Sequence, residues 1–347
     1  MDRVGYALAS RIFDRYTRSG QQGEEMSLRT AWVSFERKHL TAKTVEAPPL
    51  LLFWWGSYGY KGGPTLGDLM AVNNLSARLA RGGIEHAVVS HTDLRLPDHL
   101  SVDDIYSIQP AQKLVFVCGP VTDNRELRDL LSIHARAKKV AVGVSVLTNQ
   151  STMNGRFDRI VARDGADRSY FDLAIAEFVA PAQRGTTFST VGVCLRGPQG
   201  EYGDARKGMA QLAETVFQDV VRQNGFQPIS IDTVLSAKNT PATINAQLAA
   251  SDIVLTTRMH GALLALAAGK PVIAIDQVPG GAKVAAVVGK TGWPFVFRAE
   301  NVGPETIHEA VDNLRRGDWQ AQVLAAQGQI RGMTDEALAA SVAAIED

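Results

Sequence analysis

The segment around residue 258 combines residue types that could bind an anion and transfer a proton. Arg258 and His260 follow directly after an apolar run at 253–256, and Gly261 begins a stretch of small apolar residues. Arginine presents a planar fork of N–H donors that suits a carboxylate or a phosphate, and histidine can act as acid or base near neutral pH. The amino end of a helix adds unpaired N–H groups. Together these features predict an anion site with a proton-transferring group beside it.

Two further cations follow apolar runs in the same part of the chain. Arg196 comes directly after the run at 190–195, and Lys283 comes shortly after Gly280 and Gly281. A pair of glycines can turn successive N–H groups toward an anion. We therefore expect Arg196 and Lys283 to join Arg258 in binding one negatively charged ligand.

Two acidic residues stand at corresponding places earlier in the chain. Gly67 and Asp68 close a long glycine-containing loop that also holds Tyr58 and Tyr60, and Asp164 ends another apolar run. Each aspartate could serve as a base, although an acid at a helix start is often only a cap and an Arg-Asp pair often only a salt bridge. The glycine spacing differs from G-x-G-x-x-G, so a nicotinamide dinucleotide site is not predicted.

Composition and missing motifs exclude several classes of protein. Lys+Arg and Asp+Glu both number 36, a net charge of zero that argues against a nonspecific nucleic-acid binder. The sequence holds no nucleophile elbow and no metal-ligand motif, so neither a resident metal nor another cofactor is expected. Cys118 and Cys194 lie in apolar runs typical of reduced core thiols, which favours a cytoplasmic protein. No apolar run approaches the roughly 18 residues of a membrane span.

Short apolar runs alternate with helical patterns over most of the chain, which predicts parallel sheets built from βαβ units. The predicted strands are 50–55, 87–90, 114–118, 140–146, 160–163, 190–195, 228–231, 253–256 and 272–275. The predicted helices are 67–81, 124–137, 169–178, 206–223, 243–250, 259–268 and 282–288, followed by a helical tail from residue 305.

The alternation divides at a Pro- and Gly-containing link at 181–187, so we expect an α/β protein with two Rossmann-like domains that face a cleft. Residues 1–48 are expected to be a helical extension, 49–183 the first domain and 184–347 the second domain with the tail. The basic helix expected within residues 1–20 could dock on the body of the protein or lie at the inner face of a membrane.

The motif that runs from Arg258 to Lys283 resembles the polysaccharide pyruvyl transferases. Their signature, R-[LM]-H-G followed by a small-residue helix, G-x-P-V-I and a lysine, is matched by Arg258-Met259-His260-Gly261, by Lys270-Pro271-Val272-Ile273 and by Lys283. Weaker matches are Gly67-Asp68, Arg163-Asp164 with Ser169, and Arg196. The sequence departs from the family pattern at Thr65, where an asparagine is usual, and in the longer spacing from Arg163-Asp164 to Ser169. The resemblance covers about residues 50–292.

The resemblance implies a GT-B-like fold and transfer of a pyruvyl group from phosphoenolpyruvate to two hydroxyls of a sugar in a cell-surface glycan. It places the donor on Arg258, Arg196, Lys283 and Gly261, with His260 as the acid and Asp68 or Asp164 as the base. The loop of Tyr58, Tyr60, Gly67 and Asp68 would hold the acceptor, which could be a free glycan, a nucleotide sugar or a lipid-linked unit. Two alternatives remain: a glycosyltransferase that uses a nucleotide sugar, and a noncatalytic binding protein of polysaccharide assembly.

Overall fold

The computed structural model describes residues 48–60, 63–96, 98–101, 111–182, 187–199 and 208–347. These residues belong to one compact unit, made of residues 47–102 and 110–347. The expected helical extension lies outside the described residues except for residue 48, and the expected link at 181–187 is described only at its two ends.

The first half of this unit contains a parallel six-stranded sheet with the order β3-β2-β1-β4-β5-β6. This is the strand order of a Rossmann sheet, whose ligands bind where the order reverses, here between β1 and β4. The strands are β1 (Leu50–Trp54), β2 (Ala87–Ser90), β3 (Leu100–Ser101), β4 (Lys113–Val117), β5 (Lys138–Ser145) and β6 (Arg159–Asp164).

The second half contains a parallel five-stranded sheet with the order β11-β10-β9-β7-β8. Counted along this half, the order is that of a flavodoxin-like sheet, which reverses between β7 and β9. Arg196 follows β7 and Arg258 follows β9, so both arginines stand at the predicted ligand-binding edge. The strands are β7 (Thr190–Cys194), β8 (Gln227–Ser230), β9 (Ile253–Thr256), β10 (Val272–Asp276) and β11 (Val296–Arg298).

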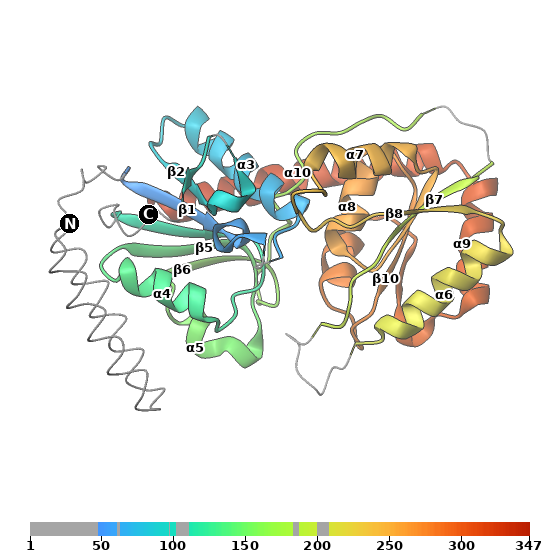
Figure 1. Ribbon diagram of the computed structural model, residues 1–347, viewed down its shortest axis with the longest axis horizontal. Coiled ribbons are helices and arrows are strands. Elements are labelled where there is room, and N and C mark those ends of the chain that lie inside the picture. Colours follow the sequence, from blue (N-terminus) through green and yellow to red (C-terminus); the bar gives the residue numbers. More distant parts are fainter. Residues whose placement is uncertain (1–47, 61–62, 97, 102–110, 183–186, 200–207) are drawn as a thin grey trace, which may run out of the picture. The chain divides into compact units, whose positions relative to one another are not determined.

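Helices cover the sheets and supply the core. In the first half, α3 packs on β1, β2 and β4 through buried residues three or four positions apart, among them Leu69, Val72, Leu75 and Leu79. Figure 1 shows α4 on the opposite face of that sheet. The helices before the tail are α3 (Leu66–Arg81), α4 (Arg125–Ile133), α5 (Ser151–Asn154), α6 (Ala210–Gln223), α7 (Pro241–Ala250), α8 (Met259–Ala267) and a π-helical turn, η8 (Val284–Val288).

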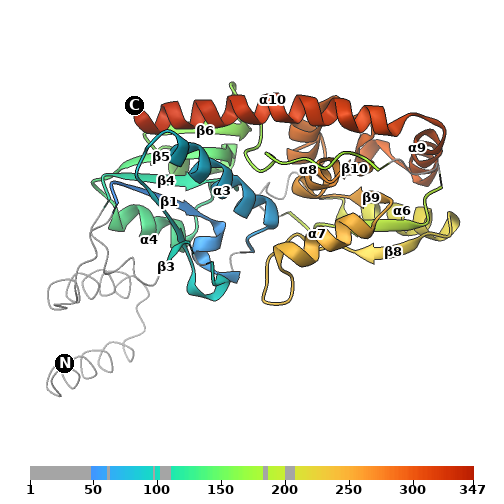
Figure 2. The same ribbon diagram turned by 90° about the horizontal axis from the view of Figure 1, so that it is seen from above.

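The tail is helical, as predicted, but it breaks at Gly317 into α9 (Pro304–Arg316) and α10 (Trp319–Glu346). Figure 2 shows α10 running along both halves, and it contacts α3, β5 and β6 of the first half as well as α8 of the second. The buried Gln327 of α10 donates to the carbonyl oxygens of Val179 (2.9 Å) and Leu266 (2.7 Å). The tail therefore packs back across the first half.

The predicted α/β class with two parallel sheets is confirmed, and each predicted strand matches an observed one to within two residues at either end. Two short edge strands, β3 and β11, were not predicted. Cys118 and Cys194 are buried free thiols, as expected.

The helix predicted at 169–178 is wrong, because this segment is extended and irregular. Residues 171–175 are all buried, which a helix on a protein surface could not achieve since it buries only one side. The backbone of this segment makes hydrogen bonds to other segments instead. Tyr170 N–H donates to the Ala162 carbonyl at 2.8 Å, and the Asn74 amide donates to the carbonyls of Leu173 and Ala174. The segment leads the chain from β6 past α3 and carries Asp172 into the interior.

Candidate functional site

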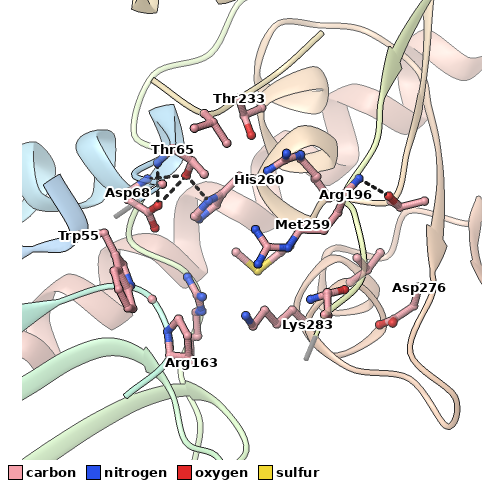
Figure 3. Close-up of a pocket in the computed structure, with 18 of the residues that line it drawn as sticks. Trp55, Thr65, Asp68, Arg163, Arg196, Thr233, Met259, His260, Asp276 and Lys283 are labelled. Carbon is pink, nitrogen blue, oxygen red and sulfur yellow. Dashed lines mark hydrogen bonds between the residues drawn. The ribbon is translucent and has the colours of Figure 1, made fainter. Parts of the chain in front are cut away.

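A cavity of about 430 Å³ lies where the carboxyl ends of the two sheets meet (Figure 3). Both halves line it, so the site depends on residues far apart in the sequence. The first half contributes Trp55, Gly63, Thr65, Asp68, Gly119, Pro120, Thr122 and Arg163. The second half contributes Arg196, Gln199, Thr233, Val234, Thr257, Arg258, Met259, His260, Asp276, Lys283 and Val284.

The second-half wall carries the cations that the sequence singled out. Arg258 is fixed by two contacts: its Nε donates to the Leu195 carbonyl at 2.7 Å, and a terminal nitrogen lies 3.2 Å from the Asp232 carboxylate. Burial lowers the pKa of the Arg258 guanidinium, and the positive charge of Arg196 acts in the same direction. Two neighbouring arginines in a partly buried wall favour an anionic ligand, whose charge would offset this cost.

Lys283 lines the same cavity, but its loop is built differently from the expected anion nest. Gly280 and Gly281 do have left-handed φ angles of 79° and 81°. The N–H groups around them, however, are already used, because the buried Asp276 carboxylate accepts from the backbone of Ala282 at 2.6 Å and Glu300 accepts from Gly280. The loop therefore positions Lys283, and its backbone is not an open anion site.

His260 lies at the start of α8 and faces the first half. Its Nδ1 is 3.2 Å from the hydroxyl oxygen of Thr65, and its Nε2 is 3.3 Å from the carboxylate of Asp172. The imidazole fits because Gly67 has no side chain: a Cβ there would lie 2.2 Å from the ring. Gly67 therefore makes room for His260, and the two halves meet at this residue pair.

Asp68 and Thr65 form the amino-terminal cap of α3. Thr65 is the N-cap, and its backbone N–H and hydroxyl both donate to Asp68 Oδ2, at 2.9 and 2.8 Å. The other carboxylate oxygen accepts from the Cys118 thiol at 3.1 Å. Asp68 thus has the structural role that the sequence left open, and it also lines the cavity beside His260.

Arg163 and Asp172 form a buried ion pair beneath this group. Their atoms approach to 2.7 Å, and Arg163 also donates to the Cys118 sulfur at 3.1 Å. Burial by itself raises the pKa of Asp172, but His260 and Arg163 outweigh it and hold that pKa well below its usual range. A closed ring of hydrogen bonds therefore connects the two halves, and we call it the polar ring. Its members are the side chains of Asp172, His260, Thr65, Asp68, Cys118 and Arg163.

Three members of the polar ring have the atoms of a metal site. Ligand atoms of Asp68, Cys118 and His260 lie within 4.8 Å of one another. The Arg163 guanidinium beside Cys118 would repel a cation, and burial raises the pKa of the Cys118 thiol well above its ordinary value. Metal binding here would require these contacts to be replaced, so the residues fit a network of protein hydrogen bonds better than a metal centre.

The structure does not bring every predicted site residue to the cavity. Tyr58 and Tyr60 are absent from its lining, whereas Trp55, just before them in the sequence, is part of it. Asp164 is also outside the lining, since its carboxylate accepts from Ser145 at 2.8 Å and pairs with Arg163. Gly261 is buried beneath His260, where a Cβ would meet Thr256 Oγ1 at 2.5 Å and Cys194 Sγ at 2.9 Å.

Among the site residues that sequence reasoning missed are Trp55, Thr65 and Asp172. The T-x-x-D spacing from Thr65 to Asp68 is a capping pattern and could have identified the cap. Trp55 directly follows a buried strand, which is where ligands of parallel sheets bind. No local signal marks Asp172, because its partners lie in other segments of the chain.

Comparison with known proteins gives a partial family match. Residues 208–277 match the family model of polysaccharide pyruvyl transferases. Comparison with curated proteins found no match to this sequence. Within the described residues, no helix is long and apolar enough to span a membrane.

Solved structures show a distant likeness in fold. The glycosyltransferase of kitacinnamycin is 12% identical, with a TM-score of 0.45, over 85% of this chain and 97% of its own. A UDP-GlcNAc 2-epimerase from Methanocaldococcus jannaschii is 9% identical, with a TM-score of 0.46, over 84% and 100%. A UDP-GlcNAc 2-epimerase from Neisseria meningitidis is 10% identical, with a TM-score of 0.45, over 85% and 99%.

The family match confirms the resemblance drawn from the sequence over the segment that contains α6, β9, α8 and β10. That segment carries Arg258 and His260, two of the residues that line the cavity. From residue 208 to residue 277, the chain has the sequence pattern of the polysaccharide pyruvyl transferase family.

Proposed function

We propose that the protein transfers a pyruvyl group from phosphoenolpyruvate onto two hydroxyls of a sugar, forming a cyclic ketal and releasing phosphate. The observation that carries the proposal is the set of cations from separate strand ends that line one cavity together with His260. The family match over residues 208–277 supports the same reaction. The reaction needs no resident cofactor, because the donor supplies the group that is transferred.

The charge of the donor fits the second-half wall. Phosphoenolpyruvate carries a carboxylate and a phosphate, and Arg258, Arg196 and Lys283 line that wall. Arginine forks bind such oxygens through pairs of parallel hydrogen bonds, while lysine adds a mobile point charge. We assign the donor to these three side chains.

His260 and Asp68 are the proposed acid and base. Addition to the donor needs a proton at its methylene carbon, which creates an electron-poor centre that the first sugar hydroxyl attacks. Asp68 takes the proton of that hydroxyl as the new C–O bond forms. The second hydroxyl then displaces phosphate, and its proton leaves with the phosphate. His260 supplies the proton of the new methyl group, and the proton that Asp68 takes from the first hydroxyl must return to His260. Over the whole cycle, one hydroxyl proton then ends on the methyl group and the other on the phosphate.

The acceptor is assigned to the first-half wall. Trp55 is half-buried there and is held by edge contacts with Tyr58 and Phe116, at 5.6 and 6.1 Å between ring centroids. Gly119 lies against its indole, where a Cβ would be 1.5 Å from Nε1. Aromatic rings beside uncharged residues such as Pro120 suit the apolar faces of a sugar. The wall supports a glycan acceptor, free or lipid-linked, without identifying the sugar.

The test is release of inorganic phosphate from phosphoenolpyruvate in the presence of sugar acceptors, measured beside release of nucleoside diphosphate from nucleotide sugars. Acceptor-dependent phosphate release is expected, and substitution His260→Ala should lower kcat by about 10²–10⁴-fold. Near-normal turnover of that variant would remove His260 from the mechanism. Nucleoside diphosphate release would favour a glycosyltransferase, and tight anion binding without turnover would favour a binding protein.

A further inference from the structure

We infer that Asp172 is a positioning residue that, together with Thr65, holds His260 as an imidazolium with its Nδ1–H on the cavity side. The inference rests on the proposed function only for the use that is made of this proton. The protonation state itself follows from the hydrogen-bond partners of the ring and can be tested without substrate.

The Nε2 side of the ring faces an acceptor. Asp172 Oδ2 lies 3.3 Å from Nε2, and the same oxygen accepts from Arg163 at 2.7 Å. The other carboxylate oxygen accepts from the Ala174 backbone at 2.8 Å. Asp172 is completely buried, and its pKa is held well below the usual range by His260 and Arg163 in spite of burial. An ionised carboxylate can only accept, so Nε2 must carry a hydrogen.

The Nδ1 side also faces an acceptor, because the Thr65 hydroxyl has a single hydrogen. That hydrogen goes to Asp68 Oδ2 at 2.8 Å, which leaves lone pairs on Thr65 Oγ1. One lone pair accepts from the Asp68 backbone N–H at 3.2 Å. The other lies 3.2 Å from His260 Nδ1, and this contact is a hydrogen bond only if Nδ1 carries a hydrogen. With hydrogens on both nitrogens, His260 is an imidazolium.

The charges around the ring agree with this assignment. Among the described residues, Asp172 contacts the ring, Asp68 and Cys118 lie close to it, and Arg163 is paired with Asp172. Arg258, Arg196 and Lys283 line the same cavity. Cys118 stays a neutral thiol, since burial raises its pKa well above the ordinary value. Of these groups, Asp172 has the carboxylate that contacts a ring nitrogen, at 3.3 Å, so the charge in contact with the imidazole is negative.

The two ring nitrogens of His260 have different environments, so we assign them different roles. Thr65 lines the cavity, whereas Asp172 does not. Nε2–H therefore anchors the imidazole to the interior, whereas Nδ1 lies beside a residue of the cavity lining, so that its proton is on the side of a bound donor. Transfer of that proton to the methylene carbon leaves a neutral imidazole that is still bonded to Asp172, and a proton from the acceptor side restores the acid.

The first experiment records the ring-nitrogen resonances of ¹⁵N-histidine-labelled protein at pH 7 without substrate. The chain has 7 histidines, and the His260→Gln variant identifies the signals of His260 by their loss. We expect the imidazolium pattern in the unmodified protein, its loss in Asp172→Asn and its partial recovery in Asp172→Glu. Asp164→Asn is the matched control, because Asp164 pairs with Arg163 but does not contact His260. A neutral imidazole in the unmodified protein would overturn the inference.

The second experiment is a double-mutant cycle on kcat. Asp172→Asn should lower kcat by about 10- to 100-fold and shift the loss of activity at high pH to lower pH, because the carboxylate that stabilises the acid form is gone. In the His260→Gln background, the same change should lower kcat less than about threefold. Equal losses in both backgrounds would show that Asp172 only stabilises the fold. If Asp172→Asn does not fold, Thr65→Val tests the other nitrogen in the same spectra. Absence of any turnover would refute the proposed function and leave the spectra to decide the inference.

Discussion

The two walls of the cavity differ in charge and in origin. The second-half wall presents Arg196, Arg258 and Lys283 from strand ends and a following loop, and each is recognisable from its local sequence. The first-half wall presents Trp55 and the capped start of α3, with Arg163 turned into a buried ion pair. A wall with several partly buried cations selects a charged ligand, whereas a wall of hydrogen-bonded polar groups and an aromatic ring suits a neutral one. Donor and acceptor would then be separated by charge within one cavity.

The largest effect on donor binding is expected for Arg258→Ala, which removes the fixed guanidinium from the second-half wall. Loss of two or more charge-assisted hydrogen bonds should weaken phosphoenolpyruvate binding by about 10²–10³-fold. Calorimetric titration measures it, and Arg222→Ala, at an exposed arginine of α6, is the matched control. Unchanged donor affinity would contradict the assignment of the donor to Arg258. An equal change in the KM of the acceptor would contradict the binding of donor and acceptor to different walls.

A smaller effect is expected for Gly67→Ala, at the contact between the walls. The added methyl group would lie 2.2 Å from the His260 ring, so the imidazole must move. We expect kcat to fall by about 10- to 100-fold with little change in donor affinity, since a displaced acid affects chemistry more than binding. Gly328→Ala in α10 is the matched control, because a methyl group there meets nothing within 4 Å. If both variants keep full kcat, Gly67 does not position His260.

Trp55→Ala tests the first-half wall. Loss of a stacking surface should raise the KM of the sugar acceptor by about 5- to 10-fold, and Trp55→Phe should recover part of the loss. Steady-state kinetics with both substrates varied measures the two KM values. The KM of the donor should stay within about twofold, and a larger change there would place Trp55 at the donor.

The smallest effect is expected for Asp252→Asn, which lies away from the cavity. Its carboxylate accepts from the backbone N–H groups of Ser189 and Thr190 at 3.0 and 2.9 Å, at the start of β7. Partial burial raises its pKa, but these hydrogen bonds outweigh burial and hold the pKa below the usual range. The stabilisation is therefore present above pH ~4 and is lost as the pH falls further.

Asp252→Asn should lower the free energy of unfolding by no more than about 1 kcal/mol at pH 7, because the group is partly exposed. Urea unfolding at pH 7 and at pH 3 measures the difference, which should shrink at the lower pH. Enzymatic activity at pH 7 should not change. A difference that grows on acidification would contradict the direction of the pKa shift.

The local sequence pattern was sufficient to predict the strands and the cations of the second-half wall. Apolar runs such as 253–256 are buried on both faces, so composition alone identifies them, and the residue after each run must lie at the ligand-binding edge. Arg196 and Arg258 were found in this way. The same reasoning failed at 169–178, where a helix-like pattern lies in an extended segment whose hydrogen bonds come from β6 and α3.

The sequence by itself determined the α/β class, the alternation into two parallel sheets and the cations at their edges, because these depend on patterns within a few residues. The tertiary structure decided which groups face one another. Thr65, Asp172 and His260 are separated by 88 residues or more, and only the meeting of the two halves places a hydroxyl and a carboxylate on the two nitrogens of one imidazole. The physical reason is that hydrogen bonds and buried charges act over a few ångströms, and distances of that kind are set by packing and not by sequence spacing.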